Sequence, residues 1–411
     1  MRKDKTIKRN TYVKGVNSLQ TLTPITPSER IGLIDIIRGF AIFGIYLVNM
    51  QDFYSPWTHL KPGDWWKSPI DLGTQAFIDI FAQANFYTLF SFLFGFGMVI
   101  FKERAMQKND SFVPLFSRRL IVLLGLGVIH AFFIWSGDIL IPYALIGFLL
   151  LLFHNARPKT LMIWAFILIA FSTTMYSAEL YHLQSTYSDA DFANYRSMMA
   201  YQALEIYQSG TYTEITNYRI DEWLRIYDGD GFLYVTMLLL PMFLLGAAFA
   251  KKKWLHDVNE HKAIIKKIWV FTLFTGVFFK LLPYLFEKTL VNEYLQDALG
   301  GQAVAIFYAT SITLLIENQR WRTRLSNLAY IGRLSISNYL FQSVLSTLIF
   351  YNYGLGFYGK VTPFIGLLLT ILIFFIQIPL SKLWLTHFRI GPVEWVWRSL
   401  TYKSKQPLRN R

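Results

Sequence analysis

The sequence RRLIVLLGLGVIHAFFIWSGDILIPYALIG, residues 118–147, predicts two apolar helices joined by a tight turn at Ser136 and Gly137. An apolar run approaching about 20 residues can cross a bilayer as a helix. His130 lies just before the turn and Asp138 just after it. Ionisable groups at membrane depth are costly, so both residues are candidates for a functional site.

The rest of the chain predicts the same kind of environment. Apolar residues make up 54% of the 411 residues, and there is no cysteine, which excludes disulfides and thiolate sites. The net charge of +14 could indicate nucleic-acid binding in a soluble protein. In a chain with several apolar runs it is better explained by lysines and arginines gathered on the cytoplasmic side, so no nucleic-acid partner is expected.

Hydropathy predicts an all-α, polytopic integral membrane protein with about ten transmembrane helices. If the N-terminus is cytoplasmic, 31 of the 40 lysines and arginines lie in cytoplasmic segments and seven lie outside. This asymmetry predicts that both termini are cytoplasmic, in a multi-pass protein of the plasma membrane. We expect a basic tail at 1–30, one transmembrane domain at 31–402 and a basic tail at 403–411. The predicted spans are 33–50, 77–101, 118–135, 138–154, 160–180, 231–250, 263–283, 297–316, 328–350 and 361–383.

The longest outer segment, 181–230, is polar, acidic and rich in tyrosine. We expect it to form amphipathic helices over the outer mouth of the bundle. No histidine pair has the spacing of a zinc site with an open position, and no metal is expected. No motif for a tightly bound cofactor is present either.

Besides Asp138, four residues near the predicted outer half of the membrane are candidate catalytic residues. His130 lies roughly 8 Å inside Trp135 at the rise of an α-helix. His59 lies among tryptophans in the first outer loop, and imidazole suits general-base or nucleophilic catalysis near neutral pH. Asp79 starts the second span, where it favours the helix N-terminus or orients a histidine. Asn49 ends the first span and could instead simply bond a neighbouring helix.

Four cations are expected at the inner face. Arg38, three helical turns before Asn49, either extends to the inner headgroups or binds a ligand. Arg333, Lys382 and Arg398 belong to the same predicted side. Together these four residues could receive a phosphate-bearing ligand from the cytoplasm.

Several motifs in order resemble the YeiB-like membrane proteins, the family called domain of unknown function 418. They are RGFAIFGIYLVN (38–49), NFYTLFSFLFGFG (85–97), the hairpin at 118–147, GRLSISNYLFQS (332–343), GLGFYG (354–359) and FRIGPVEWVWRSLTY (388–402). More distantly, the chain is similar to transmembrane acyltransferases such as heparan-alpha-glucosaminide N-acetyltransferase. That resemblance implies roles for Arg38, Asn49, His59 and Asp79, although the spacing from histidine to acid is longer here. The O-acyltransferases of surface polysaccharides have a histidine where this chain has Asn49.

The leading hypothesis is a transmembrane acyltransferase. Acyl-CoA would act as a co-substrate at the basic inner face, and a histidine near the outer half would pass the acyl group to a cell-envelope acceptor such as a sugar. The alternative is a small-molecule transporter or exporter that is proton-coupled through His130 and Asp138, and a signalling or scaffold protein is a third option. The lipid bilayer is the expected partner, and a homo-oligomer is left open.

Overall fold

The computed structural model describes residues 32–61 and 63–410, so the predicted basic tail at 1–30 lies outside the described residues. The described chain is built of helices, which confirms the predicted all-α polytopic architecture. The elements are α1 Gly32–Tyr54, η2 Trp57–His59, α2 Pro69–Phe81, α3 Asn85–Gln107, α4 Phe112–Phe133, α5 Leu140–Leu151, α6 Pro158–Thr186, α7 Asp189–Ser209, α8 Tyr212–Ile226, α9 Gly229–Lys251, α10 Val258–Leu285, α11 Leu290–Leu295, the π-helical η3 Gln296–Gly301, α12 Gln302–Leu315, α13 Gln319–Leu325, α14 Leu328–Arg333, α15 Ser335–Phe350, α16 Pro363–His387 and α17 Pro392–Tyr402.

Among the described residues, eight helical stretches are long and apolar enough to cross a membrane. Two of the ten predicted spans form shorter helices than expected. In the region 138–154, α5 has 12 residues, and in the region 328–350 the chain divides into α14 and the 16-residue α15.

The predicted span 77–101 is not one continuous helix. α2 ends at Phe81 and α3 starts at Asn85, and Ala84 between them has a φ of +60°, in the left-handed region. The predicted span 297–316 begins in η3, where the helix widens to the π form before α12. Both irregularities lie inside apolar sequence that contains no proline, so hydropathy alone predicts regular helices there.

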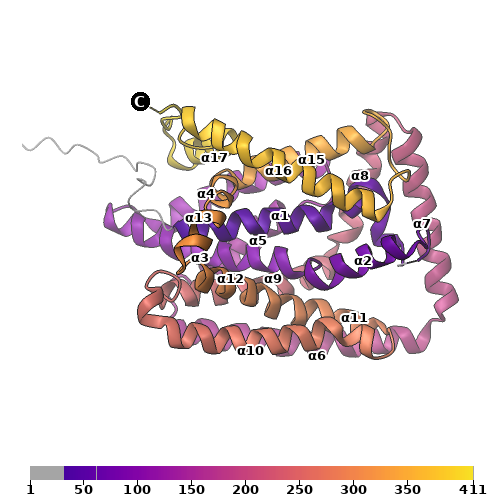
Figure 1. Ribbon diagram of the computed structural model, residues 1–411, viewed down its shortest axis with the longest axis horizontal. Helices are drawn as coiled ribbons and strands as arrows, with labels where there is room; N and C mark the ends of the chain where they lie inside the picture. Colours follow the sequence, from indigo (N-terminus) through magenta and orange to yellow (C-terminus); the bar gives the residue numbers. More distant parts are fainter. Residues whose placement is uncertain (1–31, 62, 411) are drawn as a thin grey trace, which may run out of the picture.

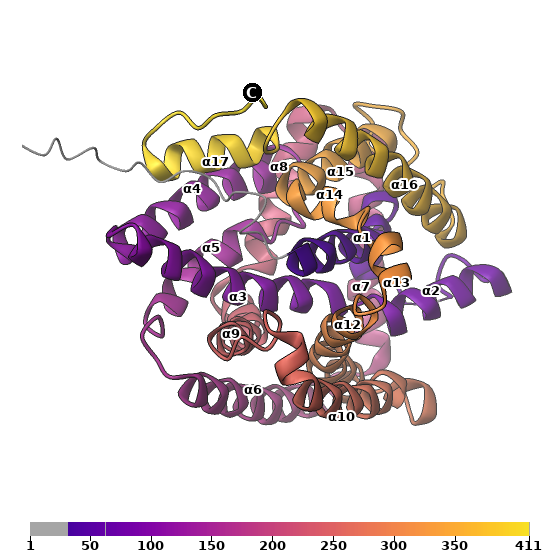
Figure 2. The same ribbon diagram turned by 60° about the vertical axis from the view of Figure 1, so that its left-hand side comes forward.

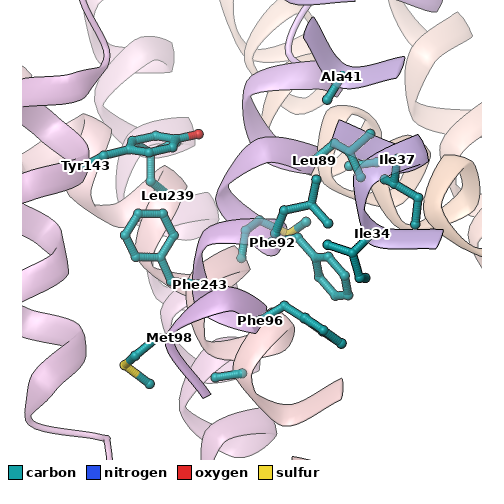
Figure 3. Close-up of a cluster of buried hydrophobic side chains, with 14 of the residues drawn as sticks. Ile34, Ile37, Ala41, Leu89, Phe92, Phe96, Met98, Tyr143, Leu239 and Phe243 are labelled. Atoms are coloured by element: carbon teal, nitrogen blue, oxygen red, sulfur yellow. The ribbon is translucent and has the colours of Figure 1, made fainter. Parts of the chain in front are cut away.

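The centre of the bundle is formed by α1, α3 and α9, with α6 and α10 along one side and α16 and α17 along the other (Figures 1 and 2). Gly95 of α3 and Gly246 of α9 allow these two helices to touch, because a Cβ at either glycine would overlap the opposing backbone carbonyl. Figure 3 shows the apolar core beside this crossing, where Phe243 of α9 lies beside Tyr143, and Phe92 and Phe96 of α3 point to the side of Ile34.

Helices α7 and α8 form the segment that was expected to cover one mouth of the bundle. Each begins with a capping box, in which a hydroxyl and an acid three residues apart satisfy the free N–H groups of the first turn. The pairs are Ser188 with Asp191 and Thr211 with Glu214. The helical prediction for 181–230 is therefore confirmed, with α6 extending to Thr186 before the first cap. We call this end of the bundle the α8 end, and the end with α13 and α17 the basic end (Figure 1).

Candidate functional site

The hairpin of α4 and α5 holds His130 and Asp138 in direct contact. His130 Nδ1 and Asp138 Oδ1 are 2.7 Å apart, and both side chains are completely buried. The second carboxylate oxygen, Asp138 Oδ2, accepts a hydrogen bond of 2.8 Å from the Ile141 N–H at the start of α5. The carboxylate is thus fixed by the helix that follows it, and it can in turn fix the tautomer and orientation of the imidazole.

The second nitrogen of this imidazole is unpaired. His130 Nε2 is buried and has no hydrogen-bond partner among the described residues. The ring lies between Trp135 and Tyr339, at centroid distances of 6.2 and 5.0 Å. Buried polar atoms are nearly always paired, so an unpaired Nε2 needs an explanation. A general base whose other nitrogen is held by a carboxylate has this arrangement when no substrate is bound.

Helix α8 holds the turn that carries this pair. Four hydrogen bonds join α8 and the residue after it to the turn at 132–138, two of them to backbone carbonyls just after His130. They are Tyr212 Oη to the Phe133 carbonyl at 2.9 Å, Arg219 Nη1 to the Phe132 carbonyl at 3.2 Å, Ser136 Oγ to Glu222 Oε2 at 2.5 Å, and Tyr227 Oη to the Asp138 carbonyl at 3.0 Å. The position of His130 and Asp138 therefore depends on α8.

Glu222 is an acidic residue of this region that sequence reasoning missed. It accepts hydrogen bonds from Ser136 and from Tyr207 Oη, the latter at 3.0 Å. Burial raises the pKa of the Glu222 carboxyl, against the opposing effect of its hydroxyl partners and of Arg225 and Arg219. In sequence it is one of several acids in a polar helix, and no local pattern separates it from the solvated ones.

His59 lies close to α8. It ends the short helix η2 and is half-buried, and burial followed by the nearby Arg225 lowers the pKa of its imidazole. Arg225 is three residues after Glu222 on α8, so α8 contributes one side chain near His59 and another that bonds the turn after His130. Arg225 is thus a charged neighbour of His59, whereas His130 is paired directly with a carboxylate.

Asp79 is not part of this arrangement. It lies near the end of α2, where its carboxylate accepts hydrogen bonds from Tyr284 Oη at 2.7 Å and Gln296 Nε2 at 2.8 Å. The structure therefore brings Asp79 to α10 and η3 rather than to a histidine. Asn49 lies on α1, about 16 Å beyond Arg38 at the rise of an α-helix, and is partly exposed.

A cavity of about 680 Å³ opens at the basic end of the bundle, and three of the four predicted cations line it. Arg38, Arg333 and Arg398 come from α1, α14 and α17, which are distant in sequence. Lys382 does not line this cavity, and its Nζ lies 6.0 Å from the centre of the Tyr330 ring. Sequence analysis missed four further cations in the lining: Arg104, Lys108, Arg119 and Lys253.

The lining of the cavity changes from charged to apolar residues with depth. Along α3 its lining extends from Lys108 to Phe90, about 27 Å at the rise of an α-helix. Three acids, Asp35, Glu103 and Glu394, also line the cavity, but they are outnumbered by its lysines and arginines. The deeper lining from α3 is aromatic and aliphatic: Phe90, Leu93, Phe94 and Phe96. The shape and chemistry suit a ligand with an anionic head and an apolar tail.

Tyr143 of α5 packs against the deep end of the cavity. Its ring centroid is 6.3 Å from that of Phe90 and 5.5 Å from that of Phe94, which both line the cavity. Tyr143 follows Asp138 by five residues, in the first turn of α5. Its hydroxyl is held by the Tyr87 carbonyl at 2.7 Å and Ser91 Oγ at 2.8 Å. One aromatic side chain therefore contacts the end of the cavity and belongs to the helix that fixes Asp138.

The sequence matches proteins found in several bacteria. The family model described as protein of unknown function (DUF418) matches residues 249–404. Uncharacterized protein YxaH of Bacillus subtilis is 40% identical over 410 residues, covering 95% of this chain and 98% of the relative. Uncharacterized protein YeiB of Escherichia coli is 28% identical over 392 residues, covering 92% of this chain and 98% of the relative. An uncharacterized 39.9 kDa protein from the amylase 3' region of Bacillus acidopullulyticus is 28% identical over 394 residues, covering 94% and 98%. The chain therefore belongs to the YeiB-like family of membrane proteins that carry the DUF418 domain.

Proposed function

We propose that this protein is a transmembrane acyltransferase of the plasma membrane, which takes an acyl group from cytoplasmic acyl-CoA and passes it to an acceptor at the outer face. One observation carries the proposal. A cavity with a basic mouth and an apolar depth lies in the same bundle as a buried His130–Asp138 pair with a free Nε2. The first feature suits an anionic acyl donor, and the second suits proton or acyl transfer.

The donor would enter at the basic end. Arg38, Arg333 and Arg398 would bind the phosphates of CoA, since guanidinium groups make strong paired hydrogen bonds to phosphate oxygens. The pantetheine arm of CoA would follow the apolar lining of α3 towards Phe90 and Tyr143, with the acyl group at its deep end. The bound thioester would then lie at the level of the α4–α5 hairpin.

His130 would act on the acceptor as a general base. Its Nε2 takes the proton of an acceptor hydroxyl, the acceptor oxygen forms a bond to the acyl carbon, and the carbon–sulfur bond of the thioester breaks. The departing CoA thiolate takes up the proton from the imidazolium, and Asp138 stabilises that imidazolium through Nδ1. An acyl-histidine route, in which Nε2 itself first attacks the acyl carbon, uses the same residues.

The proposal is tested with purified protein in lipid vesicles supplied with acyl-CoA and a cell-envelope sugar acceptor. We expect acyl transfer to the sugar by the wild-type protein and its loss in His130→Gln. His182→Gln is the matched control, because His182 is an exposed residue of α6 away from the hairpin. Equal transfer by both variants, or none by the wild-type protein with a panel of acyl donors and sugars, would count against this function.

A proton-coupled transporter or exporter is the second candidate, and the interruption between α2 and α3 favours it. Interrupted helices are typical of secondary transporters, and sequence analysis expected a continuous helix here. In that case His130 and Asp138 would carry the proton. Solute-dependent proton uptake into vesicles, lost in His130→Gln and retained in His182→Gln, would support transport over acyl transfer.

A further inference from the structure

The break between α2 and α3 leaves backbone carbonyls that need partners. The last four carbonyls of a helix have no partner within the helix, and inside a membrane no water replaces them. Side chains from other helices satisfy them here. Asn85 Nδ2 donates to the Ile80 carbonyl at 3.2 Å, and Tyr308 Oη of α12 donates to the Phe81 carbonyl at 2.8 Å.

Lys280 of α10 satisfies two more of these carbonyls. Its Nζ donates to the Gln83 carbonyl at 2.7 Å and to the Asp79 carbonyl at 3.3 Å. The residue is only 1% exposed, so its ammonium group has left water almost completely. Removing a charge from water is costly unless other groups replace its hydration, and the carbonyl end of a helix carries the negative end of the helix dipole.

The π-helical segment η3 completes the surroundings of this ammonium group. Asp297 Oδ1 lies 3.2 Å from Lys280 Nζ. Gly300 and Gly301 let η3 approach closely, since a Cβ at Gly301 would lie 2.7 Å from the Cβ of Ala84 in the break. Gln296 connects the two sides by donating to Asp79 Oδ2 at 2.8 Å and to the Lys280 carbonyl at 3.2 Å.

The oxygen atoms around Lys280 Nζ have the composition of a cation site. They comprise two backbone carbonyls at the end of an interrupted helix and one carboxylate from a facing irregular helix. Helix ends of this kind coordinate coupling ions in membrane proteins with discontinuous helices. Three acceptors also match the three N–H groups of an ammonium.

We propose that the α2–α3 break and η3 form a cation-binding site, and that the Lys280 ammonium is its permanently attached occupant. The site selects a primary ammonium group, with a small monovalent metal ion as the second class of ligand when the lysine side chain is removed. The site holds the two irregular helices together, because without a cation two carbonyls and the Asp297 carboxylate face one another. This inference is independent of the proposed acyl transfer.

The test is chemical rescue of Lys280→Ala in the detergent-purified full chain. We expect its Tm to be lower than that of the wild-type protein. Ethylammonium chloride should restore at least half of the lost Tm, and sodium or potassium chloride should restore less. Tetramethylammonium chloride at the same ionic strength should restore none, because it has no N–H to donate.

Lys288→Ala is the matched control. Lys288 is exposed in the loop after α10 and pairs with Glu293 at 3.3 Å, so its removal should change Tm little and create no response to ethylammonium. A wild-type Tm in Lys280→Ala overturns the proposal. An ethylammonium response that is equal in Lys280→Ala, Lys288→Ala and wild type, or equal to that of tetramethylammonium, also overturns it.

A second pair of variants covers the case in which Lys280→Ala is not obtained folded. Lys280→Arg keeps a cation and hydrogen-bond donors, whereas Lys280→Met keeps a similar length without them. We expect several-fold more folded, monodisperse protein from Lys280→Arg than from Lys280→Met. Equal yields, or a higher yield from Lys280→Met, would show that the site is a packing position rather than a cation site.

Discussion

The Ser136 hydroxyl donates a hydrogen bond of 2.5 Å to Glu222, and through this bond helix α8 holds the turn between His130 and Asp138. Burial raises the pKa of Glu222 above its ordinary value of 4.5. A carboxyl whose pKa is higher in the folded than in the unfolded state binds protons more tightly when folded. Its contribution to stability is therefore fully present below the unfolded pKa and is lost as pH rises through the folded pKa.

The first prediction follows from this loss of stability as pH rises. The Tm of the wild-type protein should contain a component that falls as pH rises from about the ordinary glutamate value through the raised pKa of Glu222. Glu222→Gln should remove that component, because the amide does not titrate but its oxygen can still accept from Ser136. Thermal unfolding of both proteins across this pH range measures the difference. Asp221→Asn is the control, since Asp221 is an acid on the same helix but exposed. An unchanged pH profile in Glu222→Gln would contradict the prediction.

The second prediction separates the two routes through His130. If Nε2 attacks the thioester, incubation with acyl-CoA in the absence of acceptor should leave an acyl group on the peptide that contains His130. If His130 is a base only, no adduct forms, but activity still requires a titrating side chain. Mass spectrometry of the digested protein detects the adduct, with His130→Gln as the blank. An adduct on His59 instead would assign the acyl-carrier role to the other histidine.

The third prediction concerns the basic cavity. CoA should raise the Tm of the wild-type protein, since a ligand that binds only the folded state stabilises it by about 2.7 kcal/mol at a hundred times its Kd. Arg333→Gln should need several-fold more CoA for the same shift, because Arg333 lines the cavity. Arg320→Gln should respond like the wild-type protein, because Arg320 is exposed on α13 and does not line that cavity. The prediction fails if CoA does not shift the wild-type Tm, or if the two variants respond alike.

Glu394 gives a fourth prediction, about stability. This buried carboxylate of α17 accepts hydrogen bonds from the Ile336 N–H at 2.8 Å, the Ser337 N–H at 3.1 Å and the Ser337 hydroxyl. It thereby caps the first turn of α15 from another helix. Glu394→Ala leaves those donors unpaired and should destabilise the protein by about 1–3 kcal/mol. Glu394→Gln should cost less, because one amide oxygen still accepts. Equal Tm values for Glu394→Ala and the wild-type protein would contradict this cap.

The sequence predicted contacts within one hairpin better than contacts between distant helices. His130 and Asp138 are separated by a single turn, and the apolar periods on either side place them across it; the structure has them hydrogen-bonded. The break at 82–84 depends on Lys280 and Tyr308, which are about 200 residues away in sequence. The local sequence therefore does not predict it. Lys382 shows the same limit, since hydropathy locates α16 but does not tell which side of it faces the cavity.

The fifth prediction concerns the orientation of the bundle, which the excess of lysine and arginine at one end predicts to be with both termini in the cytoplasm. The chain has no cysteine, so a single introduced cysteine is a unique reporter. Ser188 is exposed at the start of α7 at the α8 end, and Ser326 is exposed just after α13 at the basic end. In intact cells a membrane-impermeant thiol reagent should label Ser188→Cys and leave Ser326→Cys unlabelled until the membrane is opened. The reverse pattern would place the basic cavity outside the cell, where acyl-CoA is not supplied, and would remove the physical basis of the donor route.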